Sequence, residues 1–339
     1  MSWWEVIGWE VAAVAERGGA RLLAALYGPT SAGKTALAVD VARRVERDLG
    51  RRMVVISADS RQVYRHMDMG TSKTMPAEMR GIQHEMIDVA DPARKLELEE
   101  YTRLARRHIT AAFADQAVPF IVGGTGIYVS ALMEGWQVDH VGAARASLRR
   151  DFPRSMVGDA YAMLRRLSRD SAAKVHPNNY EAIINALAVL MAAAPPTSQA
   201  KRNGPATVVL GIDPGLEALD RRVARTYAEQ VRHGLFAEIE DLNARYGLDA
   251  EIRRHSWDSP NQVLHTHGYR EYFEFALERG KPVANLTEQE LAEVGSHVVE
   301  HIRRHTRRQR GWFDKLPIAR FVSSAGQAFS VIAKSLASS

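Results

Sequence analysis

The sequence predicts an α/β protein of the P-loop type, in which a parallel sheet is flanked by helices. A phosphate-binding loop of the form G-x-x-x-x-G-K-[ST] occupies residues 28–35, after an apolar run and before a helix-forming stretch. Further along the chain, short β-branched runs alternate with segments of helical spacing. Such alternation is typical of a parallel, doubly wound sheet, whose ligand site lies beyond the carboxyl ends of the strands.

The order of the elements follows from these patterns. Strands are expected over residues 21–27, 52–57, 118–122 and 207–212, with helical segments over 36–45 and 98–115. Three strands run directly into polar or glycine-rich segments, which are residues 28–35, 59–60 and 123–126. We therefore expect these three segments to meet at one edge of the sheet.

Composition narrows the classes of protein that are possible. A chain of 339 residues with 46% hydrophobic residues can bury one large or two smaller cores. The absence of cysteine excludes disulfides and thiolate zinc sites. No apolar stretch is long enough to span a bilayer, and the acidic residues near the start are unlike a signal peptide. We expect a cytoplasmic protein without membrane contact, and an amphipathic helix over residues 1–20.

Positive charge is concentrated in two segments. The chain carries a formal charge of +5, but residues 140–170 hold seven Arg against three Asp, and residues 301–320 hold seven Arg or Lys against one Asp. Two basic segments on an otherwise acidic chain are typical of a surface that binds a polyanion. The alternative is a pair of solvated helix faces.

The phosphate-binding loop indicates the ligand. Its backbone N–H groups would surround a diphosphate at the positive end of the next helix. Lys34 is expected to reach a phosphate oxygen, and the Thr35 hydroxyl to ligate Mg²⁺ as a cofactor. The candidate diphosphate-binding residues of this loop are Gly28, Pro29, Thr30, Ser31, Ala32, Gly33, Lys34 and Thr35.

Asp59 is the candidate general base. Among the three segments expected to meet at this edge, residues 28–35, 59–60 and 123–126, it is the only carboxylate. A P-loop ATPase would end a later strand in an aspartate that organises Mg²⁺, but residues 118–122 run into glycines instead. Nothing in the predicted site specifies transfer of a phosphoryl group, so a P-loop kinase is disfavoured.

The motifs resemble those of the tRNA dimethylallyltransferases (tRNA isopentenyltransferases). The resemblance covers roughly residues 22–316, and the combination of the phosphate loop with Asp-Ser-Arg-Gln-Val-Tyr is specific to that family. The matching segments are Gly28-Pro-Thr-Ser-Ala-Gly-Lys-Thr35, Ala58-Asp-Ser-Arg-Gln-Val-Tyr-Arg65, Met67-Asp-Met-Gly-Thr-Ser-Lys73, Ile87-Asp-Val-Ala-Asp-Pro92, Val122-Gly-Gly-Thr-Gly-Ile-Tyr128, His176-Pro-Asn178, Gly268-Tyr-Arg-Glu271 and Arg307-Arg-Gln-Arg-Gly-Trp-Phe313.

The resemblance implies transfer of a dimethylallyl group from dimethylallyl diphosphate to N6 of the adenine next to the tRNA anticodon, at position 37. Asp59 matches the family's base and Thr125 a position that contacts substrate, and Arg222 is a further diphosphate-binding candidate. A P-loop core would comprise residues 21–133 and 176–320, with a helical insertion over 134–175 that grips the anticodon stem-loop and a disordered or weakly helical tail over 321–339. The candidate acceptor or tRNA contacts are Asp59, Ser60, Arg61, Gln62, Thr125, Arg145, Arg149, Arg165, Arg166, Arg307 and Arg308.

Departures from the family pattern leave the acceptor open. Tyr180, Ala182 and Asn185 stand where the family usually has arginines, and Ala188 stands where it usually has a glutamate. Three functions fit: a monomeric tRNA-modifying enzyme with a drifted contact segment, an enzyme that prenylates a free adenine nucleotide, and an RNA- or nucleotide-binding protein without turnover. Retention of Asp59 and the phosphate loop argues against the third, and the basic segments argue against the second.

Two further patterns are read as structural. His297, His301 and His305 recur every four residues and could line one helix face around a metal, but no carboxylate accompanies them in the sequence, so a polar helix face is the simpler interpretation. Trp312 and Phe313 close a basic helix, where an aromatic pair is expected to serve as a packing anchor.

Overall fold

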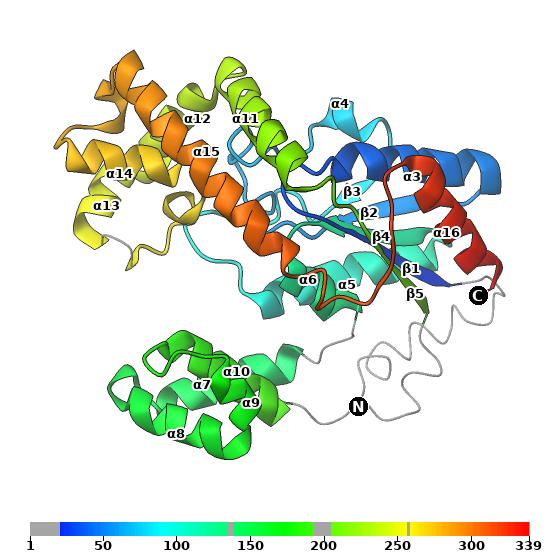
Figure 1. Cartoon of the computed structure of the whole chain (residues 1–339), viewed down its shortest axis with the longest axis horizontal. Coiled ribbons are helices and arrows are strands. Elements are labelled where there is room, and N and C mark those ends of the chain that lie inside the picture. The colour runs from blue at the N-terminus through cyan, green and yellow to red at the C-terminus, as the bar shows by residue number, and fades with distance from the viewer. Residues whose placement is uncertain (1–20, 134–137, 193–204, 256–257, 339) are drawn as a thin grey trace. The chain divides into compact units, whose positions relative to one another are not determined.

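The computed structural model describes residues 21–133, 138–192, 205–255 and 258–338, which are the coloured parts of Figure 1. The expected helix over residues 1–20 lies outside the described residues. The chain divides into two compact units, and within the described ranges the smaller comprises residues 98–103 and 138–192. None of the described helices is long and apolar enough to cross a membrane.

The larger unit is built on one parallel sheet. Its strand order is β3-β2-β4-β1-β5-β6, and every neighbouring pair is parallel. The four predicted strands are confirmed, while β3 and β6 were not predicted. The six strands are β1 (Leu22–Tyr27), β2 (Met53–Ser57), β3 (His84–Glu85), β4 (Val118–Gly123), β5 (Ala206–Gly211) and β6 (Ile318–Phe321).

Helices cover both faces of this sheet and extend beyond it (Figure 1). Helix α5 (Leu98–Ala114) follows the predicted span, although its residues 98–103 cluster with the smaller unit. Short 3₁₀ turns form at Val263–His265 and Val283–Asn285. The other helices of the larger unit are α3 (Lys34–Leu49), α4 (Pro76–Met79), α6 (Gly126–Met133), α11 (Leu216–Arg232), α12 (Leu235–Tyr246), α13 (Leu248–His255), α14 (Arg270–Glu278), α15 (Glu288–Arg310) and α16 (Ala325–Ala337).

The C-terminal segment is part of the core, which corrects the expected tail over residues 321–339. Residue 321 ends strand β6, and α16 packs against α3 on one face of the sheet (Figure 1). Ala328 and Ile332 of α16 are buried in the same apolar cluster as Val41 and Val45 of α3. Its low charge therefore reflects a helix that buries one face and not a disordered end.

The smaller unit is helical, as expected of the insertion, but it continues past residue 175. Its helices enclose an apolar cluster of their own that includes Leu148, Leu164, Ile183 and Leu187. Because α10 supplies much of this cluster, residues 176–192 group with the insertion and not with the P-loop core. The helices are α7 (Val138–Asp151), α8 (Val157–Leu167), α9 (Arg169–Ala173) and α10 (Tyr180–Ala192), with a 3₁₀ turn at Arg154–Met156.

Candidate functional site

The three loops that follow β1, β2 and β4 meet at one edge of the sheet, as the sequence predicted. These strands are neighbours in the order β2-β4-β1, so their carboxyl ends lie side by side. The Gly28 N–H donates to Gly123 O at 3.3 Å, and the Thr125 N–H donates to Ala58 O at 3.1 Å. A Cβ on Gly123 would lie 2.0 Å from Ala58 O, so only glycine permits this close approach.

The phosphate-binding loop has the backbone that an anion site requires. Gly33, with φ of +91°, directly precedes the first residue of α3, so the loop leads straight into the positive N-terminal end of this helix. The Lys34 Nζ donates to Pro29 O at 2.8 Å. An Arg222 guanidinium from α11 donates to Ala32 O at 2.9 Å, which supports the loop from outside.

The Lys34 ammonium is tuned by its surroundings. Loss of solvent around it lowers the pKa of Lys34 to about 8, while the negative charge of Asp59 acts in the opposite direction. Lys34 and the candidate base Asp59 line the same pocket. A bound diphosphate would supply the negative charge that a desolvated ammonium lacks.

Asp59 is oriented by its own loop. Its Oδ1 accepts the backbone N–H groups of Arg61 at 2.8 Å and Gln62 at 3.3 Å. The Ser60 N–H donates to the Thr125 hydroxyl at 3.0 Å, which ties the loop after β2 to the glycine turn after β4. Both loop and side chain are therefore held before any ligand arrives.

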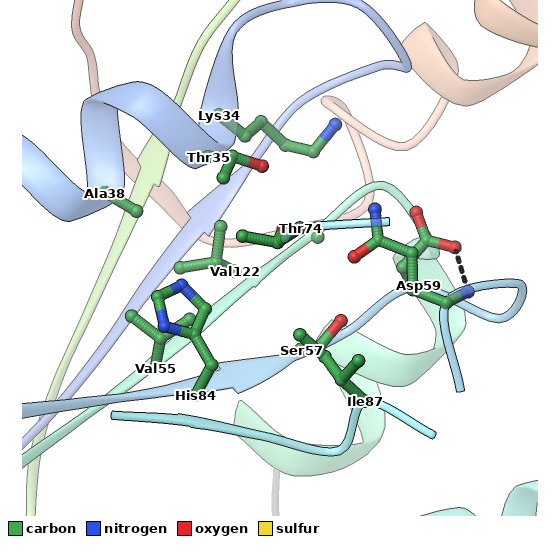
Figure 2. Close-up of a pocket in the computed structure, with 12 residues that line it drawn as sticks. Lys34, Thr35, Ala38, Val55, Ser57, Asp59, Thr74, His84, Ile87 and Val122 are labelled. Atoms are coloured by element: carbon green, nitrogen blue, oxygen red, sulfur yellow. Dashed lines mark hydrogen bonds between the residues drawn. The ribbon is translucent and has the colours of Figure 1, made fainter. Parts of the chain in front are cut away.

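One pocket joins these groups. Figure 2 shows Lys34 and Thr35 on α3 on one side, with Asp59 and Ser57 at the end of β2 across from them. The hydroxyl and carboxylate oxygens are hard donors of the kind that Mg²⁺ prefers. The Thr35 hydroxyl, in a pocket that Ser57 and Asp59 also line, thus fits a magnesium ion held together with a diphosphate.

The side chains of Arg61 and Gln62 hold the frame of the site. The Arg61 NH1 donates to Gln262 Oε1 at 3.4 Å, and the Gln62 Nε2 donates to Ser72 O at 3.0 Å. Burial lowers the pKa of Arg61, against the charges of nearby acidic and phenolic groups. These bonds connect the loop after β2 to Ser72, within the motif of residues 67–73, and to Gln262, shortly before the motif of residues 268–271.

Gln309, at the end of α15, is a site residue that the sequence interpretation missed. Its Oε1 accepts the Thr30 N–H at 2.8 Å, and its Nε2 donates to Gly124 O at 2.8 Å. Its backbone carbonyl accepts the Tyr27 hydroxyl at 2.6 Å. One buried amide thus bridges the phosphate loop and the glycine turn. Gln309 lies within the motif of residues 307–313, of which the sequence interpretation gave a role only to the arginines and the aromatic pair.

The aromatic pair after Gln309 packs, as expected. The ring of Trp312 lies directly against Gly126, where a Cβ would come within 2.1 Å of it. Phe313 meets the rings of Tyr27 and Phe321 edge-on, at centroid distances of 5.5 and 5.0 Å. These contacts anchor the end of α15 over the sheet.

The predicted RNA-binding arginines lie in different environments. Arg307 pairs with Asp220 of α11 at 3.0 Å, whereas Arg308 is exposed near the end of α15. In the smaller unit, Arg145 and Arg149 pair with Glu99 and Glu181, each at 2.8 Å. Among the described residues no carboxylate pairs with the two exposed arginines at the end of α8, which are Arg165 and Arg166.

The residues that depart from the family pattern belong to the smaller unit. Tyr180 donates its hydroxyl to Phe152 O at 2.7 Å, and Ala188 is buried in the unit's apolar cluster. Ala182 is partly exposed and Asn185 exposed. At least two of the four substitutions therefore serve the packing of this helical unit.

Comparison with known proteins gives consistent matches along the chain. The family described as IPP transferase matches residues 62–316. A protein named tRNA dimethylallyltransferase from Picosynechococcus sp. is 33% identical over 298 residues, 87% of this chain and 91% of that protein. A protein of the same name from Roseiflexus sp. is 34% identical over 308 residues, 87% of this chain and 90% of that protein.

Solved structures match the fold. The tRNA isopentenylpyrophosphate transferase of Bacillus halodurans is 27% identical with a TM-score of 0.62, covering 94% of this chain and 97% of that one. A eukaryotic dimethylallyltransferase acting on tRNA has a TM-score of 0.66 at 20% identity, over 86% of this chain and 70% of that one, and is similar in fold. With a family match over residues 62–316 and relatives at 33–34% identity, this chain belongs to the IPP transferase family.

Proposed function

We propose that this protein is a prenyltransferase that moves a dimethylallyl group from dimethylallyl diphosphate to N6 of an adenine in tRNA, the adenosine at position 37 beside the anticodon. The observation that carries the proposal is that Asp59 faces Lys34 and Thr35 across one pocket. A base on one side and an anion cradle on the other are what prenyl transfer to an amine needs. Family membership and the names of the relatives support the same reaction.

Asp59 is proposed to act as the general base. The adenine amine is a weak nucleophile because its lone pair is delocalised into the ring. As N6 forms a bond to C1 of the dimethylallyl group, the C1–O bond breaks and its electron pair leaves with the diphosphate. Asp59 accepts the proton that N6 loses. The N–H groups of Arg61 and Gln62 hold its carboxylate in place for this transfer.

The phosphate loop is proposed to bind the leaving group. Backbone N–H groups at the start of α3 and the Lys34 ammonium neutralise charge that develops on the diphosphate. Lys34 would exchange its bond to Pro29 O for one to a phosphate oxygen. Mg²⁺, held by Thr35 and the diphosphate, would add further neutralisation of that charge. Arg222 keeps the loop in shape through Ala32 O.

The acceptor side of the proposal rests on the basic residues. A stacked base must leave its stack to reach Asp59, which costs a few kcal/mol and requires contacts to the surrounding phosphates. Arg165 and Arg166, exposed on α8, and Arg308, exposed on α15, are the proposed phosphate contacts. Such contacts position the RNA and do not read its sequence. We propose that the protein is a monomer and acts in the cytoplasm.

The test is a transfer assay with labelled dimethylallyl diphosphate and Mg²⁺. Unmodified tRNA and the nucleotides AMP, ADP and ATP are offered side by side to the full chain. Label in tRNA, located to the adenosine beside the anticodon by nuclease mapping, is the expected result. Label only in a nucleotide would show that the acceptor is a free nucleotide and not tRNA. Label in neither would overturn the proposed activity.

A further inference from the structure

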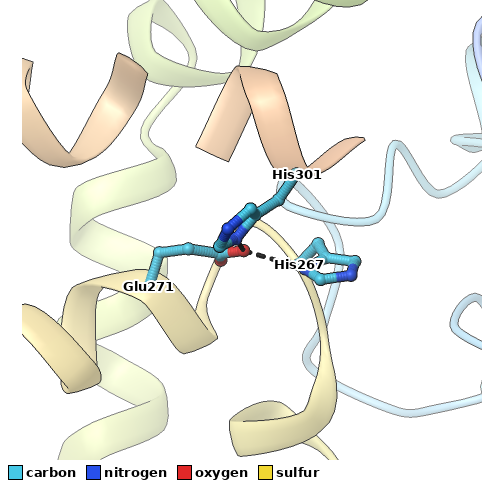
Figure 3. Close-up of side chains that lie close together, drawn as sticks. All are labelled: His267, Glu271 and His301. Carbon is cyan, nitrogen blue, oxygen red and sulfur yellow. Dashed lines mark hydrogen bonds and ion pairs between the residues drawn. The ribbon is translucent and has the colours of Figure 1, made fainter. Parts of the chain in front are cut away.

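Two histidines and one buried glutamate converge where α14 begins beside α15. The Oε1 of Glu271 lies 2.8 Å from Nδ1 of His267 and 2.7 Å from Nδ1 of His301 (Figure 3). The three ligand atoms all lie within 4.8 Å of one another. The Glu271 side chain is 3% exposed, whereas both histidines are about a third exposed, at 31% and 32%. The cluster thus combines a buried carboxylate with two rings that solvent can reach.

The arrangement around Glu271 holds the carboxylate in a fixed orientation. Its second oxygen, Oε2, accepts the Gly268 N–H at 2.9 Å, so that Oε1 is presented to the two rings. Carboxylates that ligate metals are commonly held by hydrogen bonds of this kind. His305, one turn beyond His301 on α15, has its ring centroid 5.9 Å from that of His267. A third imidazole therefore borders the same cluster.

We propose that His267, Glu271 and His301 form a binding site for one Zn²⁺ or similar transition-metal ion, with His305 bordering the open position. Two imidazole nitrogens and one carboxylate oxygen are a donor set that zinc accepts as three of its four ligands. With metal–ligand bonds of about 2.0–2.2 Å, tetrahedral ligand atoms lie roughly 3.3–3.5 Å apart, so the two Nδ1–Oε1 distances need to open by about half an ångström. The partly exposed rings allow that movement.

This site is distinct in chemistry from the magnesium pocket. The pocket beside Thr35 offers hydroxyl and carboxylate oxygens, whereas the cluster offers mainly imidazole nitrogen, which Mg²⁺ disfavours. It also differs from the pattern visible in the sequence, because His297 of the four-residue series is exposed and stands apart from the cluster. Since the ligands come from α14 and α15 and the loop ahead of α14, a bound ion would link the helix that carries Gln309 to its neighbour.

The test is metal binding by the full-length protein after removal of any affinity tag. The protein is stripped with a chelator, equilibrated with Co²⁺ or Zn²⁺ in excess Mg²⁺, and separated from free metal by gel filtration. We expect one Zn²⁺ per chain by elemental analysis, and for Co²⁺ the visible absorption of a low-symmetry site that Zn²⁺ abolishes. Zinc should also raise the melting temperature.

Matched variants decide whether this cluster is the site of metal binding and the cause of the rise in melting temperature. His301→Ala and His267→Ala should each lose the bound metal and the thermal shift, while His297→Ala, on the same helix, should keep both. Glu271→Gln is a weaker test alone because a buried side chain changes, so circular dichroism accompanies every variant. Absence of bound metal in the unsubstituted protein, or equal loss in His297→Ala and His301→Ala, would overturn the proposal.

Discussion

The phosphate-loop edge of the sheet and the helical unit of residues 138–192 are stabilised by different kinds of contact. At the sheet edge, buried hydrogen bonds join segments far apart in the sequence, such as the one from Gln309 Nε2 to Gly124 O at 2.8 Å. In the helical unit, an apolar cluster provides the frame and the arginines lie on its surface, alone or in ion pairs with partly exposed carboxylates such as Glu181. The proposed proton transfer and diphosphate binding require side chains held in fixed positions, whereas the proposed contacts to RNA phosphates can be made by mobile side chains. Substitutions should therefore have large effects at the first region and small ones at the second.

The largest effect is expected at Asp59. Asp59→Asn preserves the shape and the hydrogen bonds to Arg61 and Gln62 but removes the proton acceptor, so kcat for tRNA prenylation should fall about 10²–10⁴-fold. Single-turnover assays with saturating substrates measure this, and calorimetry with dimethylallyl diphosphate should show affinity within a few-fold of the original. Asp115→Asn, on the exposed end of α5, is the control. Unchanged turnover in Asp59→Asn would remove Asp59 as the base.

Gln309 tests whether a single amide holds the sheet edge together. Gln309→Leu leaves the Thr30 N–H and Gly124 O without partners, and each loss should cost about 1–3 kcal/mol of unfolding free energy. Urea unfolding measures the change, and binding of dimethylallyl diphosphate should weaken with it. Gln309→Glu keeps an acceptor for Thr30 but sets a buried carboxylate oxygen against Gly124 O, so it should also be less stable than the original protein. A Gln309→Leu variant as stable as the original protein would contradict the bridging role.

The pH dependence of diphosphate binding tests the role of the Lys34 charge in the phosphate-binding loop. Its pKa of about 8 means that the free enzyme carries a charged Lys34 below pH 8 and loses the charge above it. A diphosphate favours the charged form, so its dissociation constant should rise above pH 8, at most about tenfold per pH unit. Lys34→Met should weaken binding at pH 7 by about 1.5–3 kcal/mol.

Calorimetry between pH 7 and 9.5, in buffers of different ionisation enthalpy, measures both the affinity and the proton uptake. In Lys34→Met the rise above pH 8 should disappear, because the titrating group is gone. A rise that persists in the variant would assign the pH dependence to another group.

The smallest effects are expected in the helical unit. The double variant Arg165→Ala/Arg166→Ala should raise KM for tRNA a few-fold, leave kcat unchanged and reduce the salt slope of tRNA binding by about one per lost phosphate contact. Filter binding at roughly 50 to 200 mM salt measures the slope, because affinity that depends on phosphate contacts falls steeply over this range of concentration. Arg149→Ala is the matched control, because Arg149 is already paired with Glu181. An unchanged slope in the double variant would exclude both arginines from the RNA surface.

The sequence predicted the frame of the candidate site well because its signals are local. A glycine-rich loop before a helix, and polar residues directly after buried strands, place side chains at the carboxyl edge of a parallel sheet with little dependence on the rest of the fold. Strands β1, β2, β4 and β5 were found in this way, as was the meeting of Asp59 with the phosphate loop. In contrast, β3 has two residues and β6 is mostly exposed, so neither leaves a clear apolar pattern.

The end of the helical unit and the role of the C-terminal segment were predicted incorrectly because they depend on packing between distant helices. The apolar positions of α10 indicate a helix with a buried face, but not which core that face enters. Ile183 and Leu187 join the cluster of Leu148 and Leu164, which moved the end of the helical unit beyond residue 175. Likewise, α16 is recognisable as amphipathic, but only packing on α3 shows that it completes the sheet's cover.

By itself the sequence determined the fold class, the phosphate loop, the candidate base and the family resemblance, because each depends on residues a few positions apart. Only the tertiary structure decided that Gln309 bridges two loops and that His301 joins His267 and Glu271, because the contacts of Gln309 with Thr30 and of His301 with Glu271 span 30 residues or more. Side chains separated so widely meet only through the packing of whole helices, and no periodicity or spacing encodes that meeting. For the same reason, the sequence showed that the arginines are concentrated in two segments but did not show which of them form ion pairs.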